Sequence, residues 1–216
     1  MRKMAFLAWL IIFFPAMVFS QEKIEAPVWN VGDKWVFDRE GPMEVTGRDA
    51  RYYSVQFSGG IFSKDASGIA IFERSTLNVK YMLESDQRKE YKGLRKKILN
   101  FPFTLGKQWK DSFERAELAS SGMLPFEYHE TFRVLGWEEV GVRAGKFKAI
   151  KLEYKIEISS RASMGWISRG ESKASYWYSA AVKNFLKCQY ENGYIEKFDQ
   201  REGRADWELV SYELRK

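Results

Sequence analysis

The side chains best suited to carry chemistry in this sequence are one histidine, one cysteine and one inward-facing carboxylate. His129 and Cys188 are the only residues of their kinds among the 216. Zinc and copper sites need several nitrogen or sulfur ligands, so we expect no metal and no cofactor. A nucleophilic triad would depend on His129 alone, and the sequence lacks a Gly-x-Ser-x-Gly motif. Cys188 shares its phase with Leu186 and Tyr190, which predicts a buried, reduced thiol.

Glu130 is the residue that could support an enzymatic alternative. The apolar positions of its predicted strand read Phe126, Tyr128, Glu130, Phe132 and Val134, so the carboxylate interrupts an inward face. A carboxyl shielded from water can act as a general acid, which would suit a hydrolase. Glycoside hydrolysis needs a second placed carboxylate, which the sequence does not identify. We therefore expect Glu130 to be partnered and not catalytic, or to lie in water near the end of the sheet.

A second candidate is a face of small residues between aromatic ones. The even positions from 166 to 178 are Trp, Ser, Gly, Ser, Ala, Tyr and Tyr, whereas the odd positions include three charged residues. The uncharged face would line a ligand cavity through Trp166, Ser168, Ser172, Tyr176 and Tyr178. It would equally accept the large side chains of a neighbouring strand, Leu152, Tyr154 and Ile156, because packed interiors combine large with small residues. We favour the filled interior.

The densest run of positive charge would suit an anionic envelope surface. It consists of Arg88, Lys89, Lys92, Arg95, Lys96 and Lys97. A solvated charged face is the alternative. Without Arg2 and Lys3, 33 of the 35 basic residues remain against 29 acidic ones, an excess too small to indicate nucleic acid binding.

These side chains must be positioned by antiparallel strands. From Ile150 to Ile158 apolar and charged residues alternate without interruption, which is typical of a half-buried antiparallel strand. Similar short runs are separated by turn residues, and aromatic residues make up 16% of the chain. This composition favours strands over helices. We predict an all-β, mainly antiparallel fold: a strongly curved sheet in a meander, open barrel or sandwich, with little helix apart from a signal peptide.

The predicted strands fall into an early and a late group. The early ones are a first strand ending near Phe37, then 44–46, 51–57, 69–73 and 77–83. The late ones are 126–134, 140–142, 147–158, 166–178, 183–191, 194–199 and 206–214, with hairpin turns at 144–145 and 192–193. Residues 85–100 predict a polar hairpin or a short helix, and residues 116–125 a loop. Breaks in the alternation at 147–150 and 209–210 predict β-bulges.

A short motif occurs twice in the chain, as Val31-Gly32-x-x-Trp35 and as Leu105-Gly106-x-x-Trp109. A turn shared by two strand starts explains the likeness, and so does a duplication into two β halves. We favour the shared turn and predict a single domain over residues 21–216. Two halves, at about 27–100 and 101–216, are the alternative.

Residues 1–20 have the pattern of a secretory signal peptide. Arg2 and Lys3 precede an apolar run from Met4 to Phe19, and Val18-x-Ser20 fits cleavage between Ser20 and Gln21. The run is shorter than a membrane-spanning helix needs. The sequence thus predicts a periplasmic or secreted protein that has no transmembrane segment after cleavage.

Several motifs together resemble a family of exported bacterial β-proteins. They are Glu139-Val-x-Val142-x-Ala-Gly145-x-Phe147-x-Ala149, Tyr176-Trp-Tyr-Ser179, Phe185-x-Lys187 and Leu105-Gly-Lys-x-Trp109. The family's members are of unknown function, some described as TapB-like, and the resemblance covers about residues 27–200. Arg143 and Ala180 stand where the family usually has proline. The resemblance implies an envelope location, an antiparallel β fold and no known active site.

Together these features favour a non-catalytic, exported module with a binding or structural role in the cell envelope. The alternatives are a hydrolase that uses Glu130 and a lipid-carrier-like protein that binds a hydrophobic ligand. An envelope protein or a hydrophobic molecule is the expected partner.

Overall fold

The computed structural model describes residues 22–39, 41–58, 67–84, 87–90, 99–119, 122–161, 167–191 and 206–216. These residues form antiparallel β-strands joined by turns, which confirms the all-β prediction. The first group of strands is β1 (Lys23–Ile24), β2 (Lys34–Phe37), β3 (Gly41–Arg48), β4 (Tyr52–Ser58), β5 (Ser67–Glu73), β6 (Val79–Glu84) and β7 (Gln87–Glu90). The second is β8 (Phe103–Thr104), β9 (Gln108–Ala119), β10 (Gly122–Val142), β11 (Gly145–Arg161), β12 (Ile167–Ser179), β13 (Asn184–Tyr190) and β14 (Trp207–Glu213).

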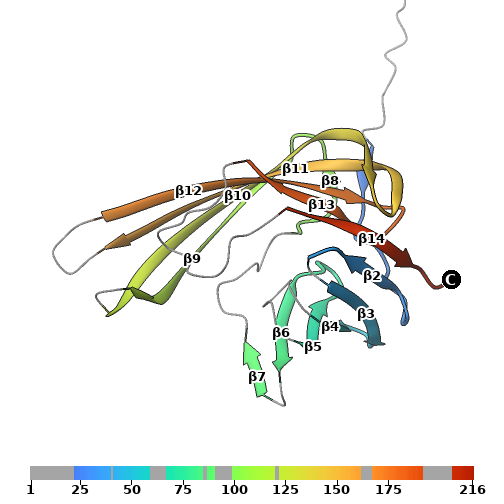
Figure 1. Cartoon of the computed structure of the whole chain (residues 1–216), viewed down its shortest axis with the longest axis horizontal. Helices are drawn as coiled ribbons and strands as arrows, with labels where there is room; N and C mark the ends of the chain where they lie inside the picture. Colours follow the sequence, from blue (N-terminus) through green and yellow to red (C-terminus); the bar gives the residue numbers. More distant parts are fainter. Residues whose placement is uncertain are drawn as a thin grey trace, which may run out of the picture.

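Two meanders share one large sheet. Its strand order is β7-β6-β5-β4-β3-β2-β14-β13-β12-β11-β10-β9, so the last strand of the second meander pairs with the first strand of the first. Among the described strands, β7 and β9 are the two edges and the sheet is open. A separate two-stranded sheet joins β1 to β8. Figure 1 shows the long hairpins β9–β10 and β11–β12 extending to one side, with the shorter strands β2–β6 below β14.

The alternation in β11 produces the predicted two faces. Its apolar residues from Ile150 to Ile158 are buried, and on the other face Lys155 hydrogen-bonds Glu157 at 2.7 Å and Glu171 at 3.0 Å. These bonds raise the pKa of Lys155 and lower the pKa of both carboxylates.

Small residues of β12 lie directly opposite large residues of β11. The pairs are Tyr154 with Ala174, Ile156 with Ser172, and Ile158 with Gly170. Directly opposed residues of an antiparallel pair project from the same face of the sheet. This complementarity in size supports the filled interior that we favoured.

The predicted loop at 116–125 is wrong. β9 runs to Ala119, β10 starts at Gly122, and the two pair up to the tip of the hairpin. The Ser, Gly and Pro residues of this stretch suggested a loop. Pro125, however, pairs with β9 only, because the described pairing of β10 with β11 starts at Phe126. A residue without an N–H is tolerated at such a position.

Of the two predicted bulges, one is confirmed. The pairing register of β14 with β2 shifts between Leu209 and Ser211. The bulge expected within 147–150 is wrong. The irregularity lies in the neighbouring strand β10, where the pairing register with β11 skips Leu135. Ala149 and Ile150 are both fully buried, each in a different apolar cluster, so both faces of β11 are covered there. Covering on both faces, and not a bulge, interrupts the alternation.

Two apolar clusters form the core. One gathers the inner residues of β2–β6 with Trp29, Val182 and Leu186, and the other gathers those of β9–β13 with Ile24 and Phe103. Residues 22–31, which we call the lead-in, therefore contribute to both clusters. Because they do so, the lead-in is held against the sheet although it contains only two strand residues.

Some predictions fall outside the described residues: the signal peptide, Trp166, Lys92, Arg95, Lys96, Lys97, the strand at 194–199 and the turn at 192–193. Arg88 and Lys89 lie in β7, which pairs with β6, a strand that ends before residue 85. Residues 91–98 lie outside the described residues, so the hairpin or short helix expected over 85–100 stays a prediction. The described residues contain no helix that is long and apolar enough to span a membrane.

Candidate ligand cleft

A glycine turn directs the lead-in into β2. Gly32 has a φ of +89°, which favours glycine, and the N–H of Asp33 donates to the carbonyl of Asn30 at 2.9 Å. The Gly32 N–H donates to the carbonyl of Val45 at 2.7 Å, and the Val45 N–H donates to the carbonyl of Asp33 at 2.9 Å. These bonds fix the lead-in at the start of β2.

The second copy of the motif has the same geometry. Gly106 has a φ of +77°, and the Lys107 N–H donates to the carbonyl of Thr104 at 3.0 Å. Gly106 donates to the carbonyl of Val134 at 3.0 Å, and the Val134 N–H donates to the carbonyl of Lys107 at 2.9 Å. A shared turn and a duplication both fit this pattern, so the division into two halves stays a prediction.

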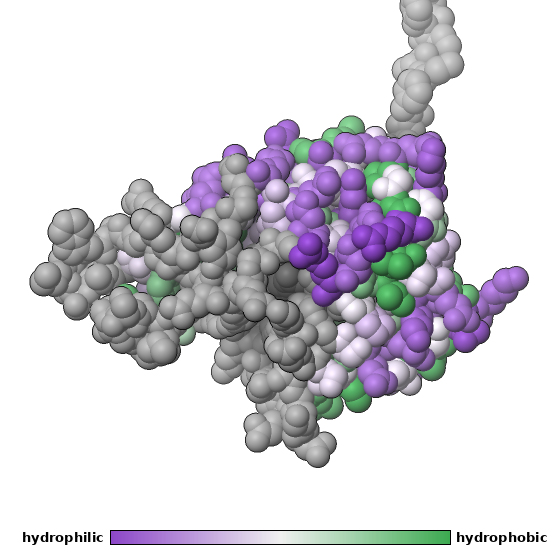
Figure 2. Space-filling model, in the orientation of Figure 1, coloured by the Kyte–Doolittle hydropathy of each residue, from purple (hydrophilic) through white to green (hydrophobic). Residues whose placement is uncertain are grey.

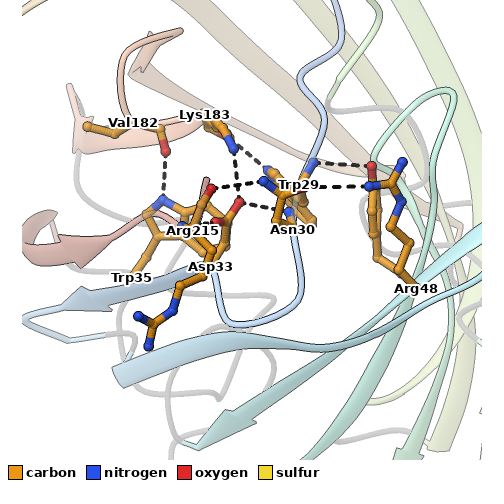
Figure 3. A network of polar contacts seen from close by, with 9 residues as sticks. Trp29, Asn30, Asp33, Trp35, Arg48, Val182, Lys183 and Arg215 are labelled. Carbon is orange, nitrogen blue, oxygen red and sulfur yellow. Dashed lines mark hydrogen bonds and ion pairs between the residues drawn. The ribbon is translucent and has the colours of Figure 1, made fainter.

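Asp33 fastens three distant segments together. Its carboxylate is fully buried and accepts hydrogen bonds from the N–H of Asn30 at 2.9 Å, the ammonium of Lys183 at 3.1 Å and the N–H of Arg215 at 2.7 Å. We call this set of contacts the Asp33 clasp (Figure 3). It joins the lead-in, the turn between β12 and β13, and the C-terminal residues.

Two indoles also hold this turn. Trp29 donates from Nε1 to the carbonyl of Lys183 at 3.0 Å, and Trp35 donates to the carbonyl of Val182 at 2.7 Å. The Trp29 N–H in turn donates to the hydroxyl of Tyr53 at 3.1 Å. Lys183 has a φ of +58°, which is uncommon for a residue other than glycine, and these contacts hold it there.

A cleft of about 530 Å³ lies between the lead-in and this turn. Its lining residues are Lys23, Ile24, Glu25, Ala26, Pro27, Val28, Asn30, Tyr178, Ala180 and Lys183. Val28 is 53% exposed, so an apolar side chain borders the open side of the cleft. On the face of the molecule drawn in Figure 2, apolar residues form small separate groups within a mainly hydrophilic surface.

Tyr178 is the unusual residue of the cleft lining. Tyr178 is 1% exposed, and its ring packs against Phe101, Phe103 and Phe185. Among the described residues, the hydroxyl has no hydrogen-bond partner. Burial raises the pKa of Tyr178, so the group remains a neutral donor. Buried polar groups nearly always have a partner, which makes this exception a candidate for ligand contact.

The other predicted ligand residues do not lie at the cleft. Tyr176 is buried among Tyr154, Phe185 and Trp207. Ser172 is buried opposite Ile156, and Ser168 lies in β12. Among the predicted ligand residues whose side chains are described, Tyr178 is therefore the one that lines it. The lead-in residues were missed because a segment without periodicity gives no signal for what it packs against.

Glu130 has the predicted orientation, and its carboxylate is partnered. It is 4% exposed and accepts a hydrogen bond from the Tyr154 hydroxyl at 2.7 Å. Asp111 of β9 lies directly opposite Glu130 in the register, so the two carboxylates project from the same face. The structure thus supplies the second carboxylate that the sequence did not identify.

His129 takes part in an exposed polar row. Its Nδ1 lies 3.0 Å from the hydroxyl of Ser112, and its Nε2 lies 3.9 Å from the carboxylate of Glu127. A serine triad has the serine on Nε2 and the acid on Nδ1, which is the reverse arrangement. The side chains of His129 and Glu127 are more than half exposed, so nothing shields the row from water.

Cys188 is fully buried and forms no disulfide, as predicted. Within the described residues, no group of three or more His, Cys, Asp or Glu side chains could hold a metal ion.

No known protein family and no curated protein matches this chain by sequence. A solved structure that matches is an inferred exported protein with a YmcC-like fold from Bacteroides fragilis NCTC 9343. It shares 10% identity, covers 89% of this chain and 100% of its own, and has a TM-score of 0.37. A superposition this loose leaves the family of the chain open, and the resemblance to the TapB-like family is not supported.

Proposed function

We propose that this chain is an exported, non-catalytic module of the cell envelope that binds an apolar ligand in the cleft between the lead-in and the β12–β13 turn. The observation that carries the proposal is Tyr178, a residue of the cleft lining whose buried hydroxyl has no partner among the described residues. A buried donor without a partner costs about 1–3 kcal/mol, and a ligand that accepts its hydrogen bond recovers that cost.

The cleft has the size and the support that a binding site needs. Its volume of about 530 Å³ lies within the range of small-molecule pockets. The Asp33 clasp and the two indole hydrogen bonds hold both walls in place before a ligand arrives. A preformed site loses less conformational entropy on binding.

The signal-peptide pattern of residues 1–20 supports the export part of the proposal. N-terminal sequencing of the protein from the exporting cell should start at Gln21, and a chain that begins at Met1 or Arg2 would contradict export with cleavage. A contact of the basic cluster at 88–97 with an anionic envelope surface is part of the same proposal.

Native mass spectrometry of protein purified from its own envelope tests the binding part. Ala180 lines the cleft and is exposed, so Ala180→Trp places an indole in the space that a ligand would occupy. Ala181 is exposed and does not line the cleft, and Ala181→Trp is the matched control. A small molecule should accompany the wild type and Ala181→Trp, and should be lost from Ala180→Trp. Equal retention by both variants would contradict binding in the cleft.

The Glu130–Asp111 juxtaposition favours a second candidate, a hydrolase. Paired carboxylates can act as acid and as base or nucleophile in glycoside hydrolysis. If this candidate is right, Glu130→Gln and Asp111→Asn each abolish turnover of a chromogenic glycoside while the melting temperature stays unchanged. Absence of turnover in the wild type, or full activity in both variants, would leave the binding module as the function.

A further inference from the structure

We propose that the ligand of the cleft is an uncharged acyl ester whose carbonyl oxygen accepts a hydrogen bond from the Tyr178 hydroxyl. The inference rests on the proposed function and specifies the chemical class of its ligand. It follows from three properties of the cleft: its free donor, the pairing of its charges and its apolar walls.

The Tyr178 hydroxyl needs a hydrogen-bond acceptor. The hydroxyl of Tyr178 is buried, stays protonated and has no partner among the described residues. A carbonyl oxygen supplies lone pairs and brings no polar hydrogen of its own. An alkane would leave the donor unsatisfied, and a ligand with only donors would add a second unsatisfied group.

The charges of the lining are already paired. Lys183 contacts the buried carboxylate of Asp33 at 3.1 Å, and Lys23 contacts Glu25 at 2.6 Å. This pairing reduces the net charge that either cation can offer a carboxylate or phosphate, and that either anion can offer an ammonium group. Moving a charge out of water without a partner is far more costly than moving a neutral carbonyl. The cleft therefore selects against charged ligands.

The remaining lining favours a chain of methylene groups and an ester in preference to an amide. Ile24, Ala26, Pro27, Val28 and Ala180 offer apolar contacts along the lead-in and the turn. The amide of Asn30 is engaged at both ends, since it donates to the carbonyl of Arg215 at 2.9 Å and its oxygen lies 3.5 Å from the guanidinium of Arg48. A ligand N–H would therefore have to compete with Arg48 for the oxygen of Asn30.

A matched series of probes, each with an eight-carbon chain, tests this inference on the full mature chain. The probes are methyl octanoate, octanoate, octylammonium and octane, each titrated while the methyl signals of Ile24 and Val28 are followed by NMR. Methyl octanoate should bind at least about tenfold more tightly than the other three, because it alone satisfies the donor without burying a charge. Tyr178→Phe keeps the ring and removes the hydroxyl. It should weaken methyl octanoate by about 5- to 100-fold and leave octane unchanged.

Tyr212→Phe is the control, since Tyr212 is 39% exposed and does not line the cleft. It should leave all four affinities unchanged. Tighter binding of octanoate than of its methyl ester, or equal binding of the ester by wild type and Tyr178→Phe, would overturn the inference and leave the proposed function standing. If no probe shifts the Ile24 and Val28 signals, the proposed binding site itself is refuted.

Discussion

The Asp33 clasp gives the most direct test of how the cleft is built. Asp33→Ala removes a fully buried carboxylate and leaves three donors behind: the N–H groups of Asn30 and Arg215 and the ammonium of Lys183. All three hydrogen bonds lie between 2.7 and 3.1 Å. The change therefore disconnects the lead-in from the β12–β13 turn and from the C-terminal residues at once.

The expected loss of stability follows from these contacts. A buried donor left without a partner costs about 1–3 kcal/mol, and breaking a buried ion pair on one side costs about 3–5 kcal/mol. Water replaces part of what each donor loses, because the side chain of Lys183 is 23% exposed, Asn30 is half-buried and Arg215 is exposed. We expect Asp33→Ala to lower the free energy of unfolding by about 3 kcal/mol, and the isosteric Asp33→Asn by less because it keeps one acceptor oxygen.

Asp38 provides the comparison. Its side chain is 18% exposed, accepts from the N–H of Glu208 at 3.0 Å and lies 3.5 Å from Arg143. Asp38→Ala should cost about 1 kcal/mol, since one hydrogen bond and a weak, partly exposed ion pair are lost. Urea denaturation followed by tryptophan fluorescence measures both variants. If the two substitutions cost the same within about 1 kcal/mol, the argument that Asp33 fastens the three segments is refuted.

Four further predictions concern residues of the inner face. Ser172→Leu should destabilise by about 1–3 kcal/mol because Ile156 already occupies the space opposite; a more stable variant would show that the space is empty. Above about pH 10 the unfolded chain loses the Tyr178 proton and the folded chain keeps it, so wild type should lose about 1.4 kcal/mol of stability per pH unit more than Tyr178→Phe; parallel pH profiles would contradict this. Cys188 should resist a bulky thiol reagent in the native state, and rapid labelling would show an open core. Glu130→Leu should change stability by only a few kcal/mol in either direction, because apolar bulk can replace a partnered buried carboxyl, and complete unfolding would disprove that.

The strands of the second meander were predictable because the alternation of apolar and polar residues within each strand indicates which side chains are buried. In β11 the residues that alternate in sequence also alternate in exposure, and a period of two is visible without any knowledge of the partner strand. The exceptions are residues that are buried by side chains of other strands. Trp177 lies on the charged phase of β12 yet is 5% exposed, because Glu138 accepts its indole N–H at 2.8 Å and Lys151 and Lys187 lie over its ring.

The candidate site was only partly predictable for the same reason. Periodicity placed Tyr178 on the uncharged face together with six other positions. In the structure Tyr178 lines the cleft because it lies near the end of β12, beside the lead-in. Asp111 was missed since nothing in the sequence shows which residue of β9 lies opposite Glu130. Pairing register and the path of a segment without periodicity depend on contacts between residues far apart in the chain.

The cleft consequently couples stability and binding in a way that two substitutions can separate. Its walls are joined by the Asp33–Lys183 contact, which links residues 150 positions apart, so the cleft exists only when both meanders and the lead-in are assembled. Asp33→Ala should weaken ligand binding and lower stability together, because it releases a wall. Tyr178→Phe removes the proposed hydrogen-bond donor to the ligand and none of the contacts that hold the walls. It should weaken binding while the protein remains at least as stable as the wild type near pH 7.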